Sequence, residues 1–307
     1  MIRDFVYFSP KTLQEALTLL SEHQDECKVI AGGQSLLILM RQRLVVPEYL
    51  IDIKGISELN YIKSDAREGL RIGALTTHRA IEKSPAMKNG FSVLAEMERR
   101  LASIQTRNWG TIGGNICHAD PTGDPAPVLI ALKATLSTAS LRGERKMAVE
   151  DFCLDYFETA LEPGELLTEI QVPAVPPHTG TAYTKFNIIE SDMATVGVAV
   201  SITLGSGEDM CQDTRIVLGA CAPIPMRAKQ AEEVLRGKKI TDSLLREAGE
   251  IASTEVEPIS DILASEEYRR ELVKVLVKRV GKEAWARAKP PLFPPPLGGM
   301  KGGDMEV

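Results

Sequence analysis

The residues best suited to hold a ligand form a short glycine-rich segment near the start of the chain, Ala31-Gly32-Gly33-Gln34-Ser35-Leu36. Glycines lack Cβ atoms, so the backbone approaches a phosphate closely and adopts positive φ, and free N–H groups at a helix start attract negative charge. The segment therefore predicts an anion cradle, to which Ser35 could add a hydroxyl donor, with a plain chain reversal as the alternative. It is not the G-x-G-x-x-G of nicotinamide-binding folds and no P-loop lysine follows, which disfavours both of those families.

A second glycine-rich segment, TIGGNICHADPTGDPAP at 111–127, places Gly113, Gly114 and Asn115 a few residues before Asp124. A neutral amide and a carboxylate suit sugar hydroxyls and polar ring groups better than phosphate, because a carboxylate repels a dianion. The two segments together predict a divided site, in which the first holds a pyrophosphate and the second holds a ribityl chain and a heterocycle. Turn residues dominate the second segment, so we expect it to be a loop.

Two other kinds of site can be drawn on the second segment. Cys117 and His118 could form a thiolate and its base, but adjacent side chains usually point apart, and packing of Cys117 is the simpler interpretation. His118, Asp120 and Asp124 could hold a metal ion, but such residues in a loop more often cap turns. We therefore predict no catalytic side chain and no metal site.

The elements that must position these segments alternate between helix and strand. Ser9-Pro10, followed by apolar residues at helical spacing, predicts a helix from about 10 to 22. The other elements expected in this part of the chain are strands at 28–31, 49–53, 70–74, 134–139 and 166–172, a helix starting at Leu36, another starting near Thr76 or Thr77, and a helix over 92–104 that ends before a polar turn at 106–110.

A cluster of prolines, PAVPPH at 173–178, predicts a domain boundary near residue 175. A small sheet-plus-helices domain is expected beyond it, with extended patterns at 194–204 and 215–220 and helical patterns at 226–236, 241–255 and 266–288. The segment 289–307 is too rich in proline and glycine for either helix or strand to persist. It is expected to be either a disordered terminus or an arm packed on a partner subunit.

The amino-acid composition and charge disfavour several classes of function. The chain has 307 residues, 36 Lys and Arg against 42 Asp and Glu, and a net charge of −6, with no clustered basic face for nucleic acid or anionic membrane. No apolar run approaches the length of a membrane span, and the N-terminus MIRDFVYFSP does not resemble a signal peptide, so a cytoplasmic location is expected. The five cysteines contain no C-x-x-C pair and are expected to be reduced thiols.

The two glycine-rich segments carry a resemblance to a known family. IAGGQSLL at 30–37 and TIGGNICHADPTGDPAPVL at 111–129, in this order, resemble the FAD-binding medium subunit of molybdenum hydroxylases, the xanthine dehydrogenase and aerobic carbon monoxide dehydrogenase family. The resemblance extends to about residue 288 and includes GELLTEIQVP at 164–173 and TKFNIIESDMATVGVAV at 184–200.

This resemblance implies an α+β fold. The expected first domain, 1–175, is a two-lobed FAD-binding domain of the vanillyl-alcohol-oxidase (PCMH-like) type, with lobes of about 1–55 and 56–175. A carbon monoxide dehydrogenase flavoprotein-type C-terminal α+β domain is expected at 176–288. The proline- and glycine-rich tail, 289–307, lies outside the resemblance.

The resemblance also implies noncovalent FAD and its contacts. The expected pyrophosphate contacts are Val29, Ile30, Ala31, Gly32, Gly33, Gln34, Ser35 and Leu36. The residues expected to line the flavin and its phosphate side are Gly110, Thr111, Ile112, Gly113, Gly114 and Asn115. Asp124 would accept hydrogen bonds from ribityl hydroxyls, and the remaining expected contacts are Leu101, Ala102, Cys117, Leu167 and Lys185. Met193 stands where many members carry an aromatic residue over the flavin, which leaves access of the acceptor open.

The resemblance finally implies an oxidoreductase subunit that transfers electrons. FAD would take them from [2Fe–2S] clusters on a small partner subunit, and a large subunit would carry the molybdopterin cofactor, in a dimer of heterotrimers. The external acceptor stays open between NAD, a quinone, a ferredoxin-like carrier and oxygen. The alternative is a non-redox FAD-binding scaffold that serves assembly of the same complex.

Overall fold

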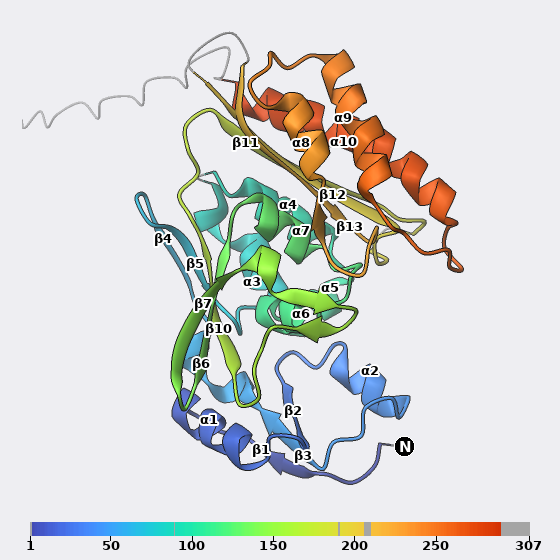
Figure 1. Cartoon of the computed structure of the whole chain (residues 1–307). Helices are drawn as coiled ribbons and strands as arrows, with labels where there is room; N and C mark the ends of the chain where they lie inside the picture. Colours follow the sequence, from blue (N-terminus) through green and yellow to red (C-terminus); the bar gives the residue numbers. More distant parts are fainter. Residues whose placement is uncertain (1, 89, 190, 206–209, 290–307) are drawn as a thin grey trace, which may run out of the picture.

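The computed structural model describes residues 2–88, 90–189, 191–205 and 210–289. All but the first residue of the tail predicted at 289–307 lie outside the described residues. The described chain forms an N-terminal lobe, a larger middle lobe and a C-terminal sheet-and-helix unit, stacked in that order along the molecule (Figure 1).

The N-terminal lobe is a three-stranded parallel sheet with strand order β1-β3-β2. Its elements are β1 (Val6–Phe8), α1 (Leu13–Glu22), β2 (Cys27–Ile30), α2 (Leu36–Arg41) and β3 (Tyr49–Asp52). Helix α1 starts later than predicted, because Thr12 rather than Ser9 caps it: the Thr12 hydroxyl accepts the Glu15 N–H at 3.2 Å. The predicted helix start at Leu36 is confirmed.

The middle lobe is built on a five-stranded antiparallel sheet with order β4-β5-β10-β6-β7. Its strands are β4 (Ile62–Asp65), β5 (Gly69–Gly73), β6 (Thr135–Ser140), β7 (Gly143–Ala148) and β10 (Leu166–Val172), with a side hairpin of β8 (Cys153–Asp155) and β9 (Glu158–Thr159). Its α-helices are α3 (His78–Lys83), α4 (Ser92–Arg100), α5 (Ile104–Trp109), α6 (Ile112–His118) and α7 (Pro125–Ala131). Short 3-10 helices lie at Ile53–Gly55, Ser57–Leu59, Pro85–Lys88 and Val149–Asp151.

Two predictions for the middle lobe are wrong. The helix predicted over 92–104 ends at Arg100, because Ala102 adopts positive φ (42°), and residues 104–109 form α5 in place of the predicted polar turn. The segment predicted as a loop at 111–127 contains α6 and the start of α7. Thr111 caps α6 by accepting the Gly114 N–H at 3.1 Å, a local hydrogen bond that outweighs the low helix propensity of two glycines.

The C-terminal unit is a four-stranded antiparallel sheet with order β11-β12-β13-β14. Its elements are β11 (Thr179–Phe186), β12 (Val196–Leu204), β13 (Cys211–Gly219), β14 (Met226–Arg227), α8 (Lys229–Leu235), α9 (Asp242–Glu255) and α10 (Glu266–Ala288). The three helices cover one face of this sheet, and the other face lies toward α4 and α7 of the middle lobe (Figure 1). The helix predicted at 226–236 is wrong at its start, since Met226 and Arg227 pair with β13 as a strand.

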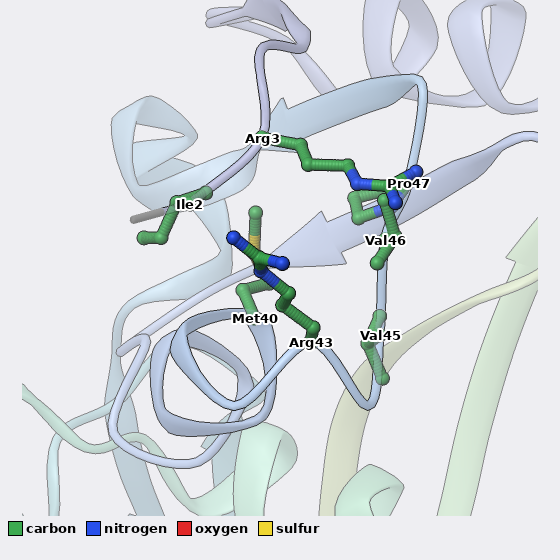
Figure 2. A pocket seen from close by; sticks show the side chains of 7 residues that line it. All are labelled: Ile2, Arg3, Met40, Arg43, Val45, Val46 and Pro47. Atoms are coloured by element: carbon green, nitrogen blue, oxygen red, sulfur yellow. The ribbon is translucent and has the colours of Figure 1, made fainter.

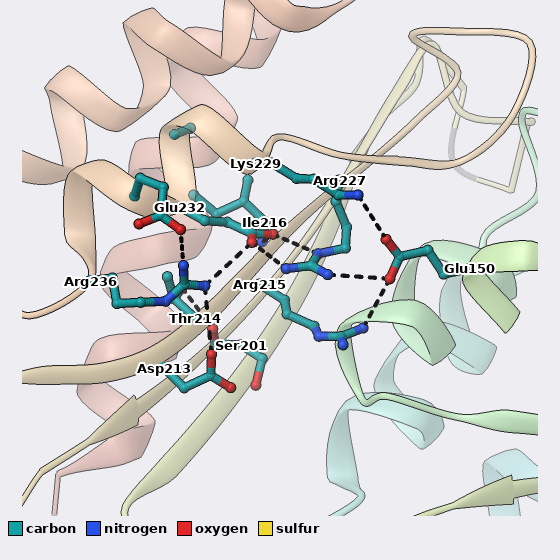
Figure 3. Close-up of polar contacts among 12 residues, drawn as sticks. Glu150, Ser201, Asp213, Thr214, Arg215, Ile216, Arg227, Lys229, Glu232 and Arg236 are labelled. Atoms are coloured by element: carbon teal, nitrogen blue, oxygen red, sulfur yellow. Dashed lines mark hydrogen bonds and ion pairs between the residues drawn. The ribbon is translucent and has the colours of Figure 1, made fainter. Parts of the chain in front are cut away.

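An ionic network joins the C-terminal unit to the middle lobe, and Glu150 is the carboxylate that the middle lobe contributes at one end of it (Figure 3). The Glu150 carboxylate lies 3.4 Å from the guanidinium of Arg215 and 3.3 Å from that of Arg227, both on the C-terminal sheet. Lys133 of the middle lobe pairs with Asp213 of β13 at 2.6 Å. These contacts fix the orientation of the sheet that presents β11 to the middle lobe.

Replacing Glu150 with glutamine should therefore loosen the junction between the two units. We expect Glu150→Gln to lower stability by about 1 kcal/mol, because the network is partly exposed and therefore screened by solvent. The midpoint of urea unfolding measures this loss of stability. The matched control is Glu162→Gln, whose pair with Arg142 is exposed and lies within one lobe, and which should have almost no effect. Equal losses from both variants would contradict this role of Glu150.

Candidate functional site

The structure brings the two glycine-rich segments into contact. A Cβ atom at Gly32 would lie 2.6 Å from the Cα of Gly110 and still closer to the carbonyl oxygen of Trp109, so only glycine fits there. A Cβ at Gly114 would lie 3.6 Å from that of Ala31. Segments about eighty residues apart in the sequence thus form one continuous surface between the N-terminal and middle lobes.

The first segment offers unused hydrogen-bond donors. Gly33 has a φ of 70°, which turns the chain from β2 into α2. Within the described part of the chain, none of the backbone N–H groups from Gly32 to Leu36 donates to another protein group, and the Ser35 side chain makes no capping hydrogen bond. Only the Gln34 side chain closes on the loop, donating to the Gly32 carbonyl at 3.0 Å. Such a set of donors fits an anionic group such as a pyrophosphate.

The second segment is different, because its backbone N–H groups from Ile112 to Asn115 already donate within the protein. The N–H of Ile112 donates to the Thr76 carbonyl at 3.0 Å, and that of Gly113 donates to the Ala74 carbonyl at 2.9 Å. A Cβ at Gly113 would lie 2.6 Å from the Ala74 carbonyl oxygen, so this glycine serves close packing against the end of β5. The stretch from Ile112 to Asn115 therefore offers no free backbone donor to an anion, and the Asn115 amide is its polar side chain.

Asp124 lies at the end of the second segment in a buried ion pair. Its Oδ2 accepts a hydrogen bond from the Lys185 ammonium at 2.7 Å, and its Oδ1 accepts one from the Tyr183 hydroxyl at 2.6 Å. Asp124 is only 4% exposed, and Lys185 and Tyr183 are buried on β11. Burial raises the pKa of Asp124, and the charge of Lys185 opposes this rise. The structure thus joins two residues predicted as contacts, and adds Tyr183, which no sequence motif had singled out.

Leu101 and Ala102, also predicted as contacts, are held by a buried arginine that sequence analysis missed. One guanidinium nitrogen of Arg107 donates to the carbonyls of Leu101 and Ala102, each at 2.7 Å, and Nε donates to Glu82 at 3.1 Å. Because Ala102 has positive φ, these hydrogen bonds stabilise an otherwise unfavourable backbone. Helix periodicity gave no signal for this break.

Some of the remaining predicted contacts are buried in the protein interior. Ile30 and Leu167 are buried in the apolar cores, so a ligand would meet them mainly through their backbone or the atoms at the core surface. Burial raises the pKa of Cys117 to about 12, which keeps it a neutral thiol, and the ring of His118 packs on Phe157 at 5.2 Å. The described residues hold no cluster of metal-ligating side chains. Met193, in contrast, is exposed.

A buried carboxyl lies beneath the second segment and should make stability depend on pH. Glu98 is 0% exposed, and its Oε2 lies 2.8 Å from Nδ1 of His78, whose own backbone N–H donates to the Gly110 carbonyl. Burial raises the pKa of Glu98 above its ordinary 4.5, against the opposing effect of His78. The folded protein then binds more protons at this site than the unfolded chain does.

The direction in which stability changes with pH follows from this difference in bound protons. As the pH rises above 4.5 toward the raised pKa of Glu98, the contribution of this carboxyl to stability should fall. We expect Glu98→Gln to remove that fall, so that the wild type loses stability relative to the variant across this range. Urea unfolding of both proteins at a series of pH values measures the difference. If the stabilities of the wild type and of Glu98→Gln change with pH in parallel, the prediction that Glu98 causes the fall is wrong.

A depression on the N-terminal lobe is not an alternative candidate for the ligand site. It is lined by Arg3, Met40, Arg43, Val45 and neighbouring residues (Figure 2), and its free volume is about 0 Å³. It has no room for a nucleotide.

Comparison with known proteins identifies the family and the fold. The family described as "FAD binding domain in molybdopterin dehydrogenase" matches residues 3–175, and the "CO dehydrogenase flavoprotein C-terminal domain" matches residues 181–284. The chain belongs to the FAD-binding subunits of molybdopterin dehydrogenases. It is thus an oxidoreductase subunit with a FAD-binding domain, and its fold combines the two expected α+β units.

This FAD-binding subunit resembles its relatives over almost its whole length. It is 37% identical to the glyceraldehyde dehydrogenase medium chain of Sulfolobus acidocaldarius, over 91% of this chain and 98% of that one. It is 36% identical to the carbon monoxide dehydrogenase medium chain of Hydrogenophaga pseudoflava, over 92% and 98%. Among solved structures, carbon monoxide dehydrogenase from the same organism superposes with a TM-score of 0.90 at 36% identity, covering 94% of this chain and 99% of that one. Quinoline 2-oxidoreductase from Pseudomonas putida 86 superposes with a TM-score of 0.88 at 33% identity, covering 94% and 99%. In the described part of the subunit, no helix is long and apolar enough to cross a bilayer.

Proposed function

We propose that this FAD-binding subunit transfers electrons from [2Fe–2S] clusters of a partner subunit through noncovalent FAD to an external acceptor. The observation that carries the proposal is the loop Gly32–Leu36, whose backbone N–H groups have no acceptor in the described chain and which lies against Gly110. These donors fit the pyrophosphate of FAD. When bound, FAD supplies the redox chemistry, and the chain's own residues bind it, orient it and exclude water.

The proposed residue roles are those that the resemblance to the family implies. The segment from Val29 to Leu36 binds the pyrophosphate, and the segment from Gly110 to Asn115 supports the flavin. Each carboxylate oxygen of Asp124 has a lone pair left beyond its present hydrogen bond and accepts a ribityl hydroxyl. The remaining proposed contacts are Leu101, Ala102, Cys117, Leu167 and Lys185. No side chain is assigned a role as acid or base.

The wider assembly is proposed from the relatives, which are named as medium chains or subunits of dehydrogenases. We assign the [2Fe–2S] clusters to a small subunit and the molybdopterin cofactor to a large one, in a cytoplasmic dimer of heterotrimers. Within the chain, the proposed division is a FAD-binding domain at 1–175, with lobes at about 1–55 and 56–175, and a C-terminal domain at 176–288.

Anaerobic mixing of the reduced small subunit with the FAD-loaded chain tests electron transfer directly. The expected result is bleaching of the flavin absorbance as the iron–sulfur absorbance returns. A complex that forms without any bleaching would contradict electron transfer and favour a non-redox scaffold.

A further inference from the structure

Glu98 and His78 form a buried pair beside the contact between the two glycine-rich segments. Nδ1 of His78 lies 2.8 Å from Oε2 of Glu98, and the two residues are 2% and 0% exposed. A Cβ atom at Gly110 would lie 3.0 Å from Cδ2 of His78 and 3.5 Å from Cγ of Gln34. The histidine ring and the loop Gly32–Leu36 therefore both lie beside Gly110, although the proposed function gives the pair no role.

The pair is a place where one proton can be held. Within the described chain, Oε1 of Glu98 has no hydrogen-bond partner. An ionised carboxylate with an unpartnered oxygen is costly in the interior, so this carboxyl favours a proton on itself or on the adjacent ring. Because the two groups are in contact, such a proton belongs to the pair rather than to one residue.

Other charged groups face the pair from the surrounding elements. Arg107 of α5 lowers the pKa of Glu98, and Asp124, which precedes α7, raises it. Both have partners of their own: Arg107 pairs with a glutamate of α3, and Asp124 accepts hydrogen bonds from Lys185 and Tyr183 of β11. Because these partners hold the other charges in place, the proton of the pair is the charge that can change when an anion arrives.

We infer that the Glu98–His78 pair takes up a proton from solvent when FAD binds, and that Glu98 acts through His78 as a positioning residue for the cofactor. The proposed function places the pyrophosphate of FAD on the loop Gly32–Leu36, and an anion there favours the protonated form of a nearby pair. The proton neutralises a carboxylate that would otherwise repel the cofactor. His78 also holds the segment, because its backbone N–H donates to the Gly110 carbonyl at 3.0 Å. The inference rests on the proposed FAD site.

Calorimetric titration of the FAD-free full chain with FAD, in two buffers of different ionisation enthalpy, counts the protons taken up on binding. Across about pH 6–8, where histidine titrates, we expect the wild type to take up protons and its FAD affinity to fall by up to about tenfold per pH unit. Glu98→Gln and His78→Gln should each remove most of this uptake and of the pH dependence. The matched control is Glu96→Gln on the same helix, whose carboxylate pairs with Arg287 at 2.7 Å and which should behave as the wild type does.

The outcomes separate this inference from the proposed function. A wild type that binds FAD without taking up protons would overturn the inference and leave the proposed function intact, and this count needs no variant. If Glu98→Gln weakens FAD binding by the same factor at every pH, the role of Glu98 is purely structural and the inference is wrong. A folded chain that binds no FAD would overturn both proposals.

Discussion

Asp124→Ala is expected to abolish FAD binding and to lower the free energy of unfolding by about 3–5 kcal/mol, because it breaks a buried ion pair. The Lys185 ammonium and the Tyr183 hydroxyl would be left buried without their acceptor. Flavin content by absorbance and urea unfolding measure the two effects. The loss of stability alone could release FAD, so a second variant is needed to separate the two.

The second variant combines Asp124→Asn with Lys185→Met. It removes both charges at nearly constant volume, and the asparagine oxygen still accepts from Tyr183. Because the buried amide N–H groups gain no acceptor, stability should lie between those of Asp124→Ala and the wild type. FAD binding should stay at least about tenfold weaker, because the charged partners of the cofactor are gone. Full recovery of FAD binding in this stable variant would contradict the proposed contacts of Asp124 and Lys185.

Gly32→Ala should have the second largest effect. Its methyl group would meet the backbone of Trp109 and Gly110, so the two glycine-rich segments must separate. Overpacking of this kind costs about 1–3 kcal/mol, which corresponds to a loss of roughly tenfold to a hundredfold in FAD affinity if the strain falls on the binding loop. Fluorescence titration of the apoprotein with FAD measures the loss.

The matched control is Gly205→Ala. Among the described residues, a Cβ there would meet only the Met210 carbonyl oxygen at 3.8 Å, an ordinary contact, so FAD affinity should be unchanged. Equal affinity of the Gly32→Ala variant and the wild type would show that contact between the two segments does not shape the site.

The elements that could be predicted are those with strong local signals. The Gly-Gly turn after β2, the helix capped at Thr77 and the long α10 all follow from caps, turns and periodicity, and the structure confirms them. The break at Ala102 could not be predicted, because its backbone is stabilised by Arg107 through tertiary hydrogen bonds.

The residues of the candidate site also divide into those that could be predicted from the sequence and those that could not. Its glycines and Asp124 could be predicted from residue type and spacing. Lys185 was expected as a contact, but its ion pair with Asp124 and the hydrogen bond from Tyr183 could not be predicted, because β11 lies about sixty residues further along the chain and meets Asp124 only in the folded protein. The helical state of Gly113 and Gly114 was also missed, since it depends on the Thr111 cap and on packing against Ala74.

The visible absorption spectrum of the purified chain, before and after denaturation, tests the central claim most directly. The account predicts a flavin spectrum, released on denaturation as free FAD that is identified by chromatography. A colourless chain that also fails to take up added FAD, although it is folded, would contradict the proposed site formed by Gly32–Leu36 and Gly110–Asn115.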